Sequence, residues 1–183
     1  MVLQAHPGKG DLPRRREPRA PRLLRPQLAT LVDRPPSGPE WLHEIKYDGY
    51  RVLARVTRNG ARLYGRNGND LTRRMAAVAR AVAMLPEIGE GWLDGEVVAL
   101  EADGRTSFPA LQAALSEHRD RDLVYYLFDM PYAHGRDLVG EPLLQRKRRL
   151  AALLAAAPSD ERRLRYSDHV QGDGPAFYEH ACR

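Results

Sequence analysis

The chain has 183 residues, of which 43% are hydrophobic and 29% charged, and its one cysteine is Cys182. This balance supports a folded domain with a sizeable core, and it excludes a disulfide framework or a cysteine-based zinc site within the chain. The sequence has no apolar run long enough to span a bilayer, and its start lacks the apolar segment of a secretory signal. We therefore expect a protein of the reducing cytoplasm without a membrane segment.

The excess positive charge lies at the start of the chain. Residues 1–25 hold seven basic and two acidic groups, a net charge of +5 that equals the net charge of the whole chain. Such an arginine- and proline-rich arm attracts phosphate backbones, although the same composition also suits a solvated linker. We predict a disordered basic arm or linker over residues 1–25 and one ordered domain over residues 26–183.

Lysine is scarce in this arginine-rich chain, where the only lysines are Lys9, Lys46 and Lys147. A lysine amine can lose its proton and act as a nucleophile, whereas an arginine stays protonated. A lysine within an ordered segment is therefore a candidate for chemistry. Lys147 stands among arginines on an amphipathic helix, and we predict that it lies on a solvated helix face.

The hydrophobic pattern predicts an α+β fold. Asp48–Gly49 and Asn59–Gly60 are hairpin turn signals between alternating segments, and hairpins followed by interspersed helices argue against a doubly wound parallel sheet. Strands are predicted at residues 41–46, 50–58, 62–65, 92–100, 123–128 and 164–170, and helices at 71–85, 108–115, 143–156 and from 175 onward.

Four short segments carry residues suited to nucleotide and phosphate chemistry. On a strand, Lys46 and Asp48 project to the same face, and Arg51 can reach the same phosphate or sugar. Each segment taken alone is equally consistent with a plain hairpin, loop or core strand. The four segments are residues 44–51, 65–68, 93–96 and 127–129.

In series, the four segments resemble the motifs of the covalent nucleotidyltransferases, which include ATP-dependent DNA ligases, RNA ligases and mRNA-capping enzymes. The flanking residues 26–29, 43–46 and 107–112 resemble, more narrowly, the ligase module of bacterial end-joining DNA ligases. The matching motifs are Lys46-x-Asp48-Gly49-x-Arg51 (motif I), Arg66-Asn67-Gly68 (Ia), Asp94-Gly95-Glu96 (III) and Phe128-Asp129 (IIIa).

This resemblance implies the antiparallel-sheet nucleotidyltransferase fold of an adenylation domain and a covalent mechanism. Lys46 would attack the α-phosphate of ATP and form lysyl-AMP, with Mg²⁺ or Mn²⁺ neutralising the phosphates. The AMP would pass to a 5′-phosphate of nicked or broken double-stranded DNA, and the nick would then be sealed in repair or end joining.

The resemblance also implies a set of ATP-contacting residues. Glu44 and the Ile45 backbone would contact adenine, on which Phe128 would stack. Glu96 would bind the ribose and help to hold the metal. The remaining implied contacts are Asp48 in motif I, Arg51 on ribose or phosphate, and Arg66 on the nucleotide or the 5′-phosphate of the nick.

Motifs IV and V and the C-terminal OB-fold of the family do not follow in this sequence. We therefore expect an adenylation domain that is incomplete at its C-terminus, marginally stable, and weakly active or inactive alone. The alternatives are one half of a split ligase, a non-catalytic remnant, and an RNA ligase or capping-type enzyme. Expected partners are DNA in the nucleoid, end-joining proteins, and a chain that supplies the missing half.

Overall fold

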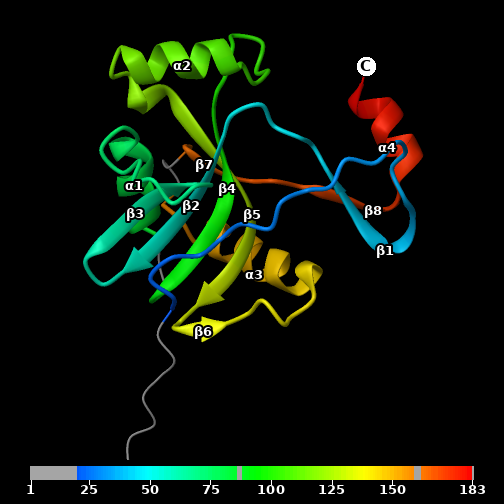
Figure 1. Ribbon diagram of the computed structural model, residues 1–183, viewed down its shortest axis with the longest axis horizontal. Coiled ribbons are helices and arrows are strands. Elements are labelled where there is room, and N and C mark those ends of the chain that lie inside the picture. The colour runs from blue at the N-terminus through cyan, green and yellow to red at the C-terminus, as the bar shows by residue number, and fades with distance from the viewer. Residues whose placement is uncertain (1–19, 86–87, 159–161, 183) are drawn as a thin grey trace, which may run out of the picture.

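The computed structural model describes residues 20–85, 88–158 and 162–182. They form a six-stranded sheet, called here the large sheet, and a two-stranded β1–β8 ribbon that lies to one side of it (Figure 1). The elements are β1 Ser37–Glu44, β2 Tyr50–Thr57, β3 Gly60–Gly65, α1 Ala76–Ala83, β4 Gly91–Ala99, α2 Phe108–Ser116, the 3₁₀ helix η1 Asp120–Asp122, β5 Leu123–Ala133, β6 Arg136–Asp137, α3 Leu143–Ala155, β7 Leu164–Tyr166, β8 His169–Asp173 and α4 Gly174–Ala181.

The large sheet has the strand order β3-β2-β4-β5-β6, in antiparallel pairs, with β7 added in parallel beside β5. Asn59–Gly60 forms the predicted β2–β3 hairpin, in which Thr57 pairs with Gly60. Gly60 has a φ of +108°, a conformation that glycine adopts without a steric penalty. The α+β fold predicted from the sequence is confirmed.

Both faces of the large sheet bury apolar side chains. On one face, alternate strand residues pack with α1, α2 and α3 into the main apolar core. On the other face, Leu53 and Trp92 pack with Ala20, and the Trp92 indole N–H donates to the Pro21 carbonyl over 3.0 Å. Ala20, Pro21 and Leu24 of the predicted arm therefore contact the sheet, while residues 1–19 lie outside the described residues.

The β1–β8 ribbon corrects two predictions. The turn signal Asp48–Gly49 predicted a hairpin, but β1 pairs with β8 and not with β2. The single strand predicted at 164–170 is divided at Ser167 and Asp168, because β7 joins the large sheet and β8 joins the ribbon. Both corrections have one cause: the partner of β1 lies more than a hundred residues away, beyond the reach of a local turn pattern.

Three further observations concern the helices and the cysteine. The helix predicted at 71–85 starts only at Ala76, because Asp70 Oδ1 and the Thr72 hydroxyl accept backbone N–H bonds in a turn before it. Cys182 is exposed. Within the described residues, every helix is too short or too polar to cross a membrane.

Candidate active site

Three motif residues meet where β2 and β4 pair. Arg51 lies opposite Glu96 in the antiparallel register, and its guanidinium forms two bonds of 2.7 Å with the buried Asp94 carboxylate. The guanidinium carbon also lies 4.7 Å from the centroid of the Phe128 ring. The bonds to Asp94 use Nε and Nη2, so Arg51 is held rigidly and keeps Nη1 for a ligand.

The glycines of two motifs permit close approach of neighbouring strands. A Cβ on Gly95 would lie 2.3 Å from the Tyr126 carbonyl oxygen, and a Cβ on Gly49 would lie 2.2 Å from the Val97 carbonyl oxygen. The space at Gly95 lets the Tyr125 side chain cross β4 and donate to the Val52 carbonyl over 2.7 Å. Gly95 therefore allows β4 and β5 to approach each other closely, and Gly49 allows the loop before β2 to approach β4.

The Glu96 carboxyl has a pKa well above its ordinary value. Burial raises the pKa of Glu96 to about 7, and the positive charges of Arg51 and Lys46 and the Gly49 N–H offset this rise only in part. A cation or a ligand hydroxyl at this carboxylate stabilises its ionised form. Glu96 is therefore suited to bind a ribose hydroxyl or a metal ion once the ligand arrives.

A cavity of about 540 Å³ opens beside these residues. Its wall carries three guanidinium groups and one carboxylate, an arrangement that favours anionic groups such as phosphates. The lining residues are Gly49, Tyr50, Arg51, Gly65, Arg66, Asn67, Asn69, Leu71, Arg74, Glu96 and Phe108. The structure thus brings together Arg51, Arg66 and Glu96, which come from three separate motifs.

Lys46 lies in the loop between β1 and β2, not on a strand face with Asp48 as the sequence predicted. Its side chain is exposed, and its charge acts on Glu96. The neighbouring Tyr47 ring stacks on Tyr126 with centroids 4.0 Å apart, and the Asp48 N–H donates to the Thr106 hydroxyl over 3.4 Å. Both contacts fix the loop just after the lysine.

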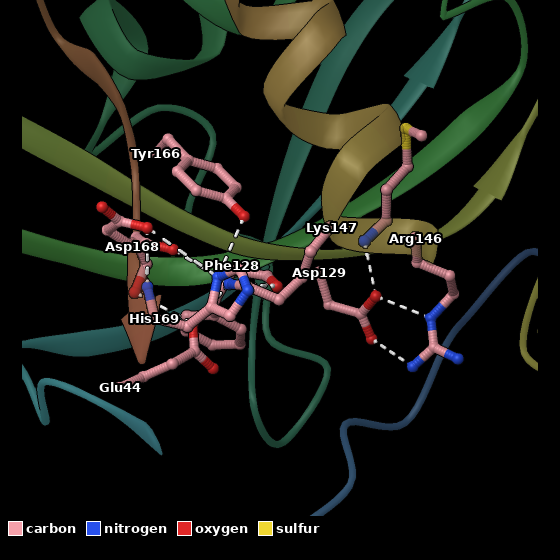
Figure 2. Close-up of polar contacts among 10 residues, drawn as sticks. Glu44, Phe128, Asp129, Arg146, Lys147, Tyr166, Asp168 and His169 are labelled. Atoms are coloured by element: carbon pink, nitrogen blue, oxygen red, sulfur yellow. Dashed lines mark hydrogen bonds and ion pairs between the residues drawn. The ribbon is translucent and has the colours of Figure 1, made fainter. Parts of the chain in front are cut away.

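The buried polar cluster around Lys147 corrects another prediction. Lys147 was expected on a solvated helix face, but its side chain is 0% exposed and its ammonium lies 2.6 Å from Glu44 Oε1. The ammonium also donates to the Phe128 carbonyl over 3.4 Å. Beside it, Arg146 binds the Asp129 carboxylate with two bonds of 2.8 and 3.0 Å (Figure 2).

The predicted site residues therefore fall into two groups. Arg51, Arg66 and Glu96 line the cavity, whereas Glu44 and Phe128 are joined to each other through Lys147. The Arg51 contact with Phe128 links the two groups. Ile45, Lys46 and Asp48 lie on the loop between them.

Sequence reasoning missed Asp94 and Lys147 as members of the site. Asp94 was named only as part of motif III and was given no role, although its place two residues before Glu96 puts both on the same face of a strand. For Lys147 the signal was the rarity of lysine in this chain, which had already marked it as unusual. Its burial could not be read from its arginine neighbours.

The described residues contain no group of three or more His, Cys, Asp or Glu side chains arranged to hold a metal ion. Mg²⁺ in nucleotide sites is commonly held by one or two carboxylates together with phosphate oxygens and water. Glu96, beside the arginine-lined cavity, fits that arrangement, whereas Asp94 is already bound to Arg51.

Comparison with solved structures defines the class of fold. The chain superposes with a TM-score of 0.72 and 29% identity on the ligase domain of Mycobacterium tuberculosis LigD, covering 87% of this chain and 50% of that one. A mycobacterial DNA ligase D complexed with ATP and MES gives a TM-score of 0.68 at 28% identity, with coverage of 87% and 50%. The fold is therefore the nucleotidyltransferase fold of these ligase domains.

Comparison of sequences identifies the family. The model of the ATP-dependent DNA ligase domain matches residues 26–175, so the chain belongs to this family. The multifunctional non-homologous end joining protein LigD of Pseudomonas aeruginosa is 42% identical over 163 residues. That alignment covers 89% of this chain and 19% of the relative, so the chain spans only a small part of the relative's length.

Proposed function

We propose that this domain carries out the adenylation step of an ATP-dependent DNA ligase. The Lys46 Nζ atom attacks the α-phosphorus of ATP, a P–N bond forms, and the bond from the α-phosphorus to the bridging oxygen of pyrophosphate breaks. The observation that carries the proposal is the rigid Arg51–Asp94 pair beside Glu96, in an arginine-lined cavity next to the Lys46 loop. Membership of the ligase domain family supports the same assignment.

The chain's own residues bind and orient the nucleotide in this proposal. Glu44 and the Ile45 backbone contact adenine, and Phe128 stacks on it. Arg51 offers Nη1 to the ribose or a phosphate, and Glu96 accepts from a ribose hydroxyl. The Asp48 N–H bond to Thr106 supports the loop that presents the nucleophile.

A divalent cation, Mg²⁺ or Mn²⁺, completes the proposed site. When bound, it would neutralise the triphosphate and make pyrophosphate a better leaving group. Glu96 would be its protein ligand in this proposal, because the residue lines the cavity and carries no ion-pair partner as close as that of Asp94.

DNA is the proposed acceptor of AMP. Arg66 and the other guanidinium groups of the cavity suit the 5′-phosphate of a nick or a broken double-stranded end, and sealing follows when a 3′-hydroxyl displaces AMP. The Pseudomonas relative is named for non-homologous end joining, which supports a role in DNA repair at the nucleoid of a bacterial cytoplasm, with end-joining proteins or a complementing chain as partners.

Intact-protein mass spectrometry after incubation with ATP and Mg²⁺ tests the proposal. We expect a mass gain equal to one AMP in the native chain and no gain in Lys46→Ala. Lys46→Arg is the matched control, because it keeps the positive charge but supplies no nucleophilic amine. Protein that is folded and gains no mass, or a gain that persists in Lys46→Arg, would contradict the assignment.

A further inference from the structure

Lys147 is a buried cation that the proposed adenylation step leaves without a role. Its side chain is fully buried, and its ammonium donates to three oxygens from three separate parts of the chain. These are Glu44 Oε1 at the end of β1 (2.6 Å), the Ser167 carbonyl between β7 and β8 (2.9 Å) and the Phe128 carbonyl on β5 (3.4 Å). An ammonium has three protons, so each has an acceptor.

Burying an unpaired ammonium is costly, and the stabilising negative charge here is Glu44. The Tyr166 ring adds a weaker attraction, with its centroid 4.7 Å from the Lys147 nitrogen. Figure 2 shows Glu44, Phe128, Lys147 and Tyr166 gathered beside α3. The charge pair therefore ties the end of the β1–β8 ribbon to α3, and the Lys147 bond to the Phe128 carbonyl extends the tie to β5 of the large sheet.

The contacts also fix the orientation of the Glu44 carboxylate. The Ser167 hydroxyl donates to Glu44 Oε1 over 3.1 Å, so both hydrogen bonds that Glu44 receives from the described residues end on the same oxygen. The side chain is 25% exposed, in contrast to the buried lysine. Oε2 is thus held in one direction and remains available to a ligand.

We propose that Lys147 is a positioning residue that selects adenine over guanine: it clamps Glu44 so that Oε2 accepts a hydrogen bond from the 6-amino group of the base. This inference rests on the proposed nucleotide-binding function. A fixed, ionised acceptor favours the exocyclic amino group of adenine. It opposes guanine, whose carbonyl oxygen at the same position is also an acceptor.

Lys147 also positions the residue on which the base is proposed to stack, Phe128. Lys147 holds the Phe128 carbonyl, while Arg51 lies against the ring of the same residue. One lysine therefore fixes both the polar group proposed for the base edge and the strand that carries the aromatic ring. We expect its loss to weaken selection between bases more than it weakens the chemical step.

Isothermal titration calorimetry with ATP and with GTP tests this inference on the native chain, Lys147→Met and Arg148→Met. Methionine keeps the length of the lysine side chain without its charge. Arg148 is the next residue of α3 and is exposed, so Arg148→Met removes one positive charge without touching the cluster. Thermal unfolding confirms that each variant is folded before titration.

We expect the native chain and Arg148→Met to prefer ATP over GTP, and Lys147→Met to lose about tenfold of that preference. A variant that was only destabilised would weaken both nucleotides equally and leave their ratio unchanged. In adenylation assays, Lys147→Met should raise KM for ATP more than it lowers kcat.

A double-mutant test separates positioning of Glu44 by Lys147 from a direct effect of the Lys147 charge on the nucleotide. Glu44→Gln should lose the ATP preference, and adding Lys147→Met to it should cause little further loss, because both changes disable one unit. An unchanged ATP/GTP ratio in folded Lys147→Met would overturn the inference and leave the proposed function intact. No ATP binding by the native chain would overturn both.

Discussion

The large sheet and the β1–β8 ribbon both contribute residues to the candidate site, but different interactions stabilise the two regions. In the large sheet, β2, β4 and β5 carry leucine and valine side chains that are fully buried against three helices. The ribbon has only two strands, and Trp41 and Val170 on it are 47% and 45% exposed. Two strands alone are marginally stable in water. The polar cluster around Lys147 is therefore important for holding the ribbon end to the large sheet.

The difference assigns separate tasks to the two regions. The large sheet provides rigid placement for Arg51, Glu96 and Phe128, whose backbones belong to the core strands. The ribbon end and the loop after it carry Glu44 and Lys46. A nucleophile on a loop can adjust to its substrate, whereas the groups that bind phosphate and ribose stay fixed by the core.

The largest expected contrast comes from truncating one apolar side chain in each region. Leu127 on β5 is fully buried, so Leu127→Ala should lower the free energy of unfolding by about 2–5 kcal/mol. Val170→Ala on the ribbon should change it by less than about 0.5 kcal/mol, because that side chain is already half exposed. Urea unfolding followed by circular dichroism measures both, and equal losses would contradict the comparison.

A smaller loss is expected from adding one methyl group where the large sheet is tightest. Gly95→Ala places a Cβ 2.3 Å from the Tyr126 carbonyl oxygen and should cost about 1–3 kcal/mol of unfolding free energy. Gly140→Ala is the matched control, since its Cβ would meet no atom within 4 Å. Urea midpoints that fall equally in the two variants would show that close approach at Gly95 is unimportant.

The smallest expected effect is a pH dependence that arises from the large sheet. The pKa of Glu96 rises from 4.5 to about 7 on folding, so its contribution to stability is full below pH 4.5 and is lost as the pH rises through about 7. Glu96→Gln should therefore flatten the fall in urea midpoint between about pH 5 and about pH 8. Glu101→Gln, at an exposed position just after β4, is the control. Parallel pH profiles for the native chain and Glu96→Gln would refute this account.

Much of the large sheet was predictable, because its signals are local. The alternation of β2, the Asn59–Gly60 turn and the α2 segment each depend on neighbouring residues, and the structure confirms them. The ribbon was not predictable in the same way. Its strands pair across most of the chain, and the strong local turn signal at Asp48–Gly49 pointed to the wrong partner.

The candidate site was likewise predictable from the sequence only in part. The sequence by itself determined the motif residues and the family, because residue identity and spacing are enough to define them. The roles of those residues at the nucleotide stay predictions. Only the tertiary structure decided which residues share the cavity and that Lys147 is buried against Glu44, 103 positions away in the chain. A buried charge is tolerated only beside its counter-charge, and the folded chain alone determines which distant residue supplies it.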